Sequence, residues 1–140
     1  MTLLLDSNVW IAAFTTHGLC ADLVRLALRF HRQSTFEPLL CPTIREEIVR
    51  VLTDKFGATD DDLAAVRTVL SWAKVIPDGN WTPTVEFSNP QDATIVGAGL
   101  AAGAELLVTG DKAVLALRRI GSIEVVTPRE AFTRLRGLSS

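Results

Sequence analysis

The stretch that decides the fold is Leu3-Leu4-Leu5-Asp6-Ser7-Asn8, an apolar run closed by an acid and two further polar residues. A short apolar run of this kind is typical of a strand that is buried on both faces of a parallel sheet. A second such run, Leu106–Val108, is followed by Thr109-Gly110-Asp111. Because ligand sites of open α/β sheets lie at the carboxyl ends of the strands, we expect Asp6 and Asp111 to meet there.

The rest of the chain alternates between strand-like and helix-like segments, which is the signature of βαβ units and indicates an α/β fold. Further strands are expected at 36–41, 75–77, 105–109 and 123–126. Helices are expected to start at 9–14 and to cover 21–31, 44–55, 60–73, 90–102, 112–119 and 128–136. The small-residue run at 97–104 predicts a helix that packs closely on the sheet.

Composition narrows the class of protein. The 140 residues are 48% hydrophobic, which favours one folded domain over residues 1–140 and argues against disorder. The formal net charge of −2 does not fit a general nucleic-acid coat protein, which would be strongly basic. A nucleic-acid substrate would therefore be held by a local patch and by metal. Cys20 and Cys41 form no CxxC pair and are expected to be small buried thiols.

Nothing in the sequence predicts a membrane protein. No run approaches the ~18 apolar residues of a membrane span. The first residues lack the basic region of a signal peptide, and their apolar run is too short for one. We therefore expect a cytoplasmic protein with no membrane partner.

Four acids stand where a phosphate-cleaving metal site would need them: Asp6, Glu47, Asp92 and Asp111. Several carboxylates in one cleft repel one another unless a cation joins them. Oxygen ligands suit hard cations such as Mg²⁺ or Mn²⁺, and no His/Cys cluster is present for zinc. A metal-activated water would then hydrolyse a phosphodiester by in-line attack.

Three of these acids also have purely structural interpretations. Asp6 can cap the helix that follows it, and Asp111 can cap the helix that begins at Lys112. With Asn89 as N-cap and Pro90 as the first helical residue, Asp92 would complement the helix dipole. Each acid alone is ambiguous, and it is their joint placement that favours a metal site.

The fourth acid has a neighbour that competes for its role. Thr43-Ile44-Arg45-Glu46 fits a capping box, which would give Glu46 a local structural task. Glu47 lies on the side of the helix that carries Ile44 and Val51, where a buried charge needs a partner. We prefer Glu47 as the ligand, with Glu46 as the alternative.

Three basic residues are candidates for contacts with a nucleic-acid backbone. Arg25 and Arg29 share one helix face at a spacing of four, and Lys112 adjoins Asp111. The alternative interpretation is an ordinary solvated face, which is the more frequent one.

The order of Asp6-Ser7-Asn8, a helical Glu47, the run 89–93 (Asn-Pro-Gln-Asp-Ala) and Val108-Thr109-Gly110-Asp111 resembles the PIN-domain nuclease family, in particular VapC-like toxins of bacterial toxin–antitoxin systems. The resemblance runs from Leu3 to the segment 125–128. It implies a three-layer α/β/α fold around a parallel sheet of four or five strands. It also implies that the four acids hold one or two Mg²⁺ or Mn²⁺ ions, with Asn8 and Thr109 as polar support.

The same resemblance implies an endoribonuclease, and it alone favours RNA over DNA, a small antitoxin partner and a homodimer. Many relatives carry a further acid shortly after the last one, whereas this chain has Lys112-Ala113-Val114-Leu115, which leaves a second metal open. Two alternatives remain. One is a catalytically weak or inactive PIN-like module that binds RNA or a partner. The other is a generic α/β binding domain whose acids are all helix caps.

Overall fold

A computed structural model describes residues 1–29, 36–82 and 91–139, and its centre is a mostly parallel sheet. Over these residues the sheet has six strands in the order β3-β2-β1-β4-β6-β5. The parallel strands are β1 (Thr2–Leu5), β2 (Glu37–Leu40), β3 (Lys74–Val75), β4 (Leu106–Val108) and β6 (Ile123–Val126). The last strand, β5 (Arg119–Ile120), pairs with β6 in the antiparallel direction. The expected parallel sheet is therefore confirmed with five strands, and β5 adds a sixth.

β1 lies in the middle of the sheet, which explains its composition. Leu3 pairs with Pro38 of β2 on one side and with Leu106 of β4 on the other. Leu3, Leu4 and Leu5 are completely buried. Just beyond β1, the N–H of Asp6 donates to the carbonyl of Val108 at 2.9 Å. This bond extends the ladder by one step and sets Asp6 beside the end of β4.

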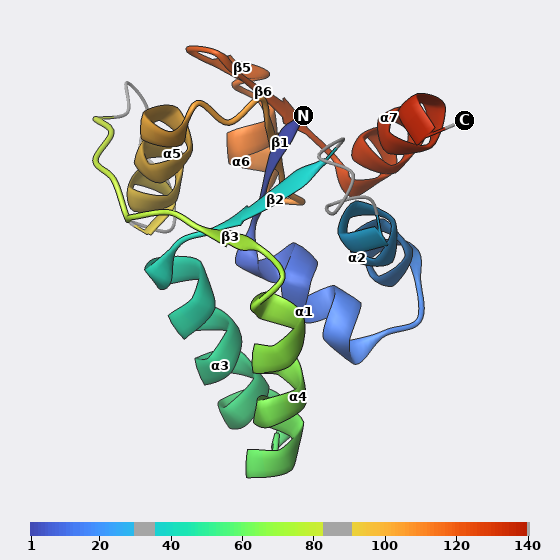
Figure 1. The fold of residues 1–140 in the computed structure, drawn as a ribbon. Helices are drawn as coiled ribbons and strands as arrows, with labels where there is room; N and C mark the ends of the chain where they lie inside the picture. Colours follow the sequence, from blue (N-terminus) through green and yellow to red (C-terminus); the bar gives the residue numbers. More distant parts are fainter. Residues whose placement is uncertain (30–35, 83–90, 140) are drawn as a thin grey trace.

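The helices form two layers around this sheet. They are α1 (Ser7–Thr15), α2 (Leu19–Arg29), α3 (Pro42–Phe56), α4 (Asp60–Leu70), α5 (Gln91–Ala102), α6 (Lys112–Leu115) and α7 (Pro128–Ser139). α2 and α7 lie side by side on one side of the sheet and α5 lies on the other, while α3 and α4 extend below the strands (Figure 1). This is the expected three-layer α/β/α arrangement. The predictions at 30–31 and at 89–90 lie outside the described residues.

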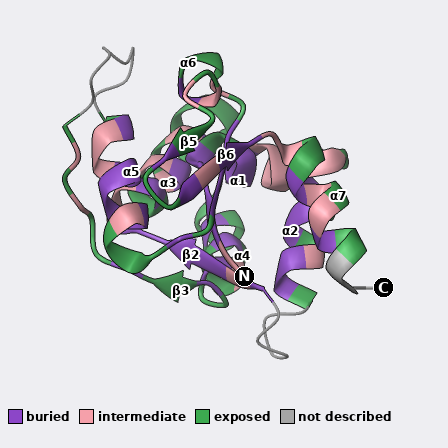
Figure 2. Ribbon diagram, turned by 90° about the horizontal axis from the view of Figure 1, so that it is seen from above, coloured by how far each residue is buried: buried purple, intermediate pink, exposed green. Residues whose placement is uncertain are grey.

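The core follows the strands and the inner helix faces, as the burial colouring in Figure 2 shows. The small-residue segment of α5 packs closely on the sheet, as expected. A Cβ added at Gly99 would stand 3.0 Å from Leu4 Cδ2 and 3.1 Å from Ile123 Cδ1. Because Gly99 has no side chain, α5 can approach β1 and β6, and its first turn is brought to the edge where Asp6 lies.

Two predicted helices are too long. The helix expected at 60–73 ends at Leu70. The helix expected at 112–119 ends at Leu115, and Arg119 begins β5. Between them Arg118 adopts a left-handed backbone conformation, with a φ of 60°, and its carbonyl accepts the N–H of Val125 at 2.8 Å. Pairing with the next strand therefore replaces the last turn of the expected helix.

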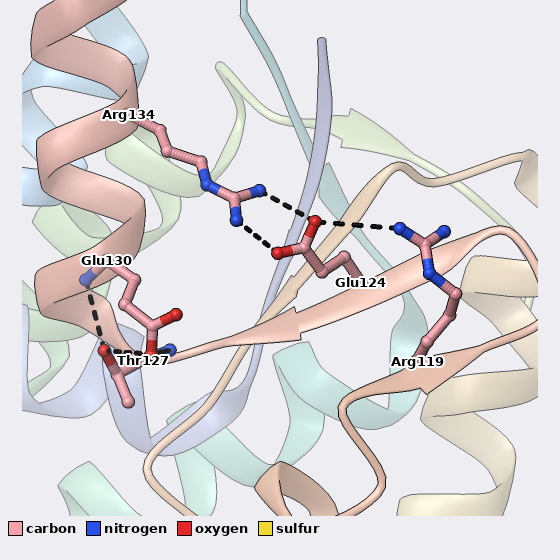
Figure 3. Close-up of polar contacts among 5 residues, drawn as sticks. All are labelled: Arg119, Glu124, Thr127, Glu130 and Arg134. Carbon is pink, nitrogen blue, oxygen red and sulfur yellow. Dashed lines mark hydrogen bonds and ion pairs between the residues drawn. The ribbon is translucent and has the colours of Figure 1, made fainter.

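α7 is fixed to the sheet by charged contacts (Figure 3). Arg134 donates to both carboxylate oxygens of Glu124 on β6, and Arg119 of β5 lies 3.8 Å from the same carboxylate. At the start of the helix, the N–H of Glu130 donates to the Thr127 hydroxyl at 3.1 Å, and the Glu130 carboxylate accepts back from Thr127. The hydrogen bonds from Arg134 hold the pKa of Glu124 below its usual value, so this carboxylate stays charged.

Among the described helices, none is long and apolar enough to cross a membrane alone, and α1 and α2 pass that test only as a pair bent by 105°.

Candidate active site

Asp6 is held at the carboxyl end of β1 by bonds to both of its oxygens. It is the N-cap of α1, and its Oδ1 accepts the N–H of Ser7 at 2.8 Å. Its Oδ2 accepts the hydroxyl of Thr109 at 2.9 Å. The structural interpretation as a cap is therefore correct. Capping explains the contact of Oδ1, while Oδ2 contacts Thr109 at the end of the neighbouring strand β4.

Thr109 links two of the predicted acids. Its side chain is 1% exposed, and its hydroxyl donates to Asp6 while accepting the N–H of Asp111 at 3.0 Å. Asp111 in turn caps α6, because its Oδ1 accepts the N–H groups of Ala113 and Val114. Thr109 thus gives the two strand ends a common hydrogen-bonded framework, in the supporting position expected of it.

Asp92 lies in the first turn of α5, where a simple dipole role would leave it in solvent. Instead it is 7% exposed, and its Oδ2 is buried with no hydrogen-bond partner among the described residues. Burial, followed by the charges of Asp6, Asp111 and Glu47, raises the pKa of Asp92 to about 7. An unpaired buried carboxylate oxygen destabilises the fold, so this acid is placed for something other than capping.

The structure separates the two adjacent glutamates of α3. Glu46 is exposed, whereas Glu47 is partly buried, and its Oε2 has no hydrogen-bond partner in the part of the chain that the structure describes. The predicted capping box is wrong, because the N-cap of α3 is Cys41 and Thr43 is already the second helical residue. Glu47 is therefore the glutamate whose carboxylate turns inward, toward the other acids.

The four acids act on one another electrostatically. Burial is the main cause that raises the pKa of Asp6, and the charges of Glu47 and Asp111 add to it against the hydrogen bonds from Thr109 and Ser7. The same pair of charges contributes to the raised pKa of Asp92. β1, α3, α5 and the end of β4 thus bring one acid each to a common edge of the sheet, as the sequence order predicted.

The donor set at this edge fits a hard divalent cation. Asp6, Asp92 and Thr109 line a crevice of about 10 Å³ together with apolar side chains from α5, β4 and α6. That volume corresponds to roughly one water-sized group. Over the described residues, no three acidic, histidine or cysteine side chains are gathered closely enough to hold an ion as they stand. The unpartnered oxygens of Glu47 and Asp92 are nevertheless carboxylate donors of the kind that Mg²⁺ and Mn²⁺ accept.

Ser7, which follows Asp6 directly, is the neighbour whose hydrogen bonds hold Asp6 in the structure. Asn8, expected as polar support, is exposed in the first turn of α1. Ser7, which the sequence did not single out by itself, is 2% exposed and donates to Asp6 through its N–H and its hydroxyl. The run of three capping residue types at 6–8 indicated that this segment has more than a capping role. It does not tell which of the three side chains turns inward.

The basic candidates do not share the acidic crevice. Arg25 and Arg29 line a different cavity of about 610 Å³, which is mainly apolar and is bordered by α1, α2 and α4. Arg25 also forms an ion pair with Asp22 at 2.8 Å. Lys112 is exposed beside Asp111 at the start of α6. Of the three, Lys112 alone adjoins one of the acids in sequence.

Comparison with known proteins agrees with this architecture. The sequence profile of the PIN domain family matches residues 2–113, and the chain belongs to this family, whose members are generally nucleases. Comparison with curated protein sequences gives no significant match.

Two solved structures share the fold. One is VapBC2 from Rickettsia felis bound to a DNA fragment from its promoter, with a TM-score of 0.65, 14% identity, and coverage of 91% of this chain and 98% of that chain. The other is PAE2754 from Pyrobaculum aerophilum, with a TM-score of 0.55, 18% identity, and coverage of 98% of this chain and 99% of that one. The expected VapC-like PIN fold is thereby confirmed.

Proposed function

We propose that this protein is a metal-dependent endoribonuclease and the toxin of a toxin–antitoxin pair. The observation that carries the metal site is the buried carboxylate oxygen of Asp92. This oxygen has no hydrogen-bond partner within 1–29, 36–82 and 91–139, and the pKa of Asp92 is raised by burial and by three other acids. Membership of a family of nucleases supports hydrolysis of a phosphodiester. RNA as substrate and the toxin role rest on the resemblance to VapC-like proteins.

In this proposal Asp6, Glu47, Asp92 and Asp111 would hold Mg²⁺ or Mn²⁺. When bound, the ion would lower the pKa of a water and stabilise charge on the attacked phosphate. Thr109 orients the Asp6 carboxylate through a 2.9 Å hydrogen bond, and Ser7 holds its other oxygen. Asp92 would have to lose its proton to act as a ligand, so ion binding would release a proton and strengthen with rising pH.

The first test is thermal unfolding with and without Mn²⁺, for the parent protein and for Asp92→Asn. We expect Mn²⁺ to raise the parent's melting temperature, because an ion bound only by the folded state stabilises it. Asp92→Asn should be at least as stable as the parent without metal, because it removes a repelled buried charge, and it should lose most of the response to Mn²⁺. If Mn²⁺ has no effect and Asp92→Asn melts lower, the acids are structural and the nuclease proposal is wrong.

Cleavage of single-stranded RNA then separates the enzyme from a binding module. Glu47→Gln should abolish Mn²⁺-dependent cleavage, whereas the adjacent and exposed Glu46→Gln should retain it. This pair is a matched control, since both changes remove one charge from neighbouring positions of α3. If the parent binds RNA and Mn²⁺ but does not cut, the alternative of a catalytically weak PIN-like module takes its place.

The remaining expectations accompany the toxin proposal. They are one PIN-like domain over residues 1–140, a cytoplasmic location, a homodimer and a small antitoxin protein that covers the site. The solved relative VapBC2 supports the antitoxin.

A further inference from the structure

The first turn of α3 takes its cap from a residue far along the chain. Its N-cap residue, Cys41, makes no side-chain cap bond, and Pro42 has no N–H to donate. The N–H of Thr43 donates to Asp78 Oδ1 at 3.1 Å, and the Thr43 hydroxyl donates to Asp78 Oδ2 at 2.8 Å. Asp78 therefore does, from 35 residues away, what an N-cap side chain does locally.

Asp78 is itself held between the sheet and α5. Two residues before it, the N–H of Ile76 donates to the carbonyl of Leu40 at the end of β2, at 2.9 Å. One residue after it, the N–H of Gly79 donates to the carbonyl of Thr94 in α5, at 3.3 Å. Gly79 lies so close to Gly97 that a Cβ on either would collide with the backbone opposite it. The segment that carries Asp78 is therefore tied to the helix that carries Asp92.

The capped turn of α3 also bears on Glu47. Thr43 and Glu47 are four residues apart in one helix, so they lie on the same face. Glu47 turns inward with a buried and unpartnered oxygen, and Asp92 on the contacting helix α5 does the same. A small rotation or shift of α3 would move Glu47 away from Asp92, and the hydrogen bonds between Thr43 and Asp78 oppose such a movement.

We propose that Asp78 is a positioning residue for the acidic site: its carboxylate holds the first turn of α3, and so Glu47, in place against α5. This role rests on the metal-dependent function proposed above. In this role Asp78 is not a ligand, and it acts through the start of α3, where its carboxylate contacts Thr43 and the Cys41 side chain.

The test compares Asp78→Ala with Asp62→Ala. Asp62 belongs to a capping box with Thr59 on α4, so its loss also removes a helix cap, but on a helix that carries none of the four acids. Calorimetric titration with Mn²⁺, well below both melting temperatures, should show roughly tenfold or greater weakening for Asp78→Ala, as for other changes behind the ligands of a metal site. Asp62→Ala should bind Mn²⁺ as the parent does.

Two further measurements distinguish positioning from general destabilisation. Cleavage of a single-stranded RNA by Asp78→Ala should return toward the parent's rate at saturating Mn²⁺, because all four acids remain, whereas Asp92→Asn should not recover.

Thr43→Val should weaken Mn²⁺ binding, and the double variant with Asp78→Ala should bind Mn²⁺ no more weakly than Asp78→Ala alone, since both changes break the same contact. If Asp78→Ala does not fold, Asp78→Asn replaces it in the test. Asp78→Asn keeps one acceptor oxygen for the Thr43 N–H, and it should still bind Mn²⁺ more weakly than Asp62→Ala does.

The outcomes separate this inference from the proposed function. If the parent binds Mn²⁺ and cuts RNA but Asp78→Ala or Asp78→Asn binds Mn²⁺ as tightly as Asp62→Ala, the positioning role is overturned and the nuclease proposal stands. If the parent itself neither binds Mn²⁺ nor loses stability from its buried acids, both are overturned. Additive losses in the double variant would also contradict the inference, because they would show that Thr43 and Asp78 act separately.

Discussion

The relative position of Asp6 and Asp111 depends on the hydroxyl group of Thr109. It donates to one acid and accepts from the backbone of the other, in a position that is 1% exposed. A side chain without a hydroxyl at this strand end would leave an oxygen of Asp6 and the N–H of Asp111 without this shared partner. The hydrogen bonds that connect Asp6 with Asp111 therefore run through a single side chain that is itself uncharged.

Replacing Thr109 should reveal this dependence. Thr109→Val keeps the shape but removes the hydroxyl, and it should destabilise the protein by about 1–3 kcal/mol because buried polar groups lose their partner. Thr109→Ser is the control: it keeps the hydroxyl, loses one methyl group, and should cost about 1 kcal/mol or less. Urea unfolding of both variants measures the difference, and equal stabilities would show that the hydroxyl is not shared as described.

At the scale of the element, α5 shows why small residues recur along one helix. Gly99 lets it approach β1 and β6, while Gly97 lets the segment at 79–80 cross its other side. These close approaches bring Asp92 to the strand ends and tie Asp78 to the same helix. The helix thus has small residues on more than one side, so it contacts the sheet and the segment at 79–80 at the same time.

Alanine substitutions at two helical glycines should change the free energy of unfolding in opposite directions. Gly97→Ala should destabilise by roughly 1–3 kcal/mol, because its Cβ would collide with the backbone of Gly79 and Asn80 and one of the two segments must shift. Gly137→Ala in α7 meets open space and should stabilise by up to about 1 kcal/mol, through helix propensity. Chemical denaturation midpoints give both values, and a neutral Gly97→Ala would contradict the close crossing.

At the scale of the whole molecule, the acidic edge makes the stability of the metal-free protein depend on pH. The pKa of Asp92 rises from 3.8 to about 7 on folding, and that of Asp6 is raised as well. Between these two values, unfolded Asp92 is ionised while folded Asp92 keeps its proton, so raising the pH favours the unfolded state. Asp62, Asp78 and Glu124 have lowered pKa values, and their contribution is lost only below their ordinary values of 3.8, 3.8 and 4.5.

We therefore expect the metal-free protein to melt at a higher temperature near pH 5 than near pH 8, with the fall complete above about pH 7. Asp92→Asn should flatten this dependence, and Mn²⁺ should raise the melting temperature more at the higher pH, where the acids are charged. Scanning calorimetry over this range checks all three statements. Stability that rises steadily toward pH 8 without metal would show that the acids do not repel one another.

The elements and the order of the acids could be predicted because they depend on local patterns. Leu3 to Leu5 and Leu106 to Val108 read as buried parallel strands and are so in the structure, and the polar residues that follow parallel strands share the carboxyl edge of the sheet. The preference for Glu47 over Glu46 likewise followed from helical spacing, and the structure turns Glu47 inward. The predicted helix through Arg119 failed because pairing between Arg118 and Val125, which are not neighbours in a helix, overrides the local preference.

The sequence by itself determined the α/β class, the buried strands and the set of four acids, because apolar runs and helical periods are properties of neighbouring residues. Tertiary structure alone decided that Ser7 rather than Asn8 turns inward, that Asp78 caps α3, and that Asp92 is buried with a pKa of about 7. Each of these depends on segments that are far apart in the chain. Such segments bury one another, and their charges interact, only after the sheet has brought them together.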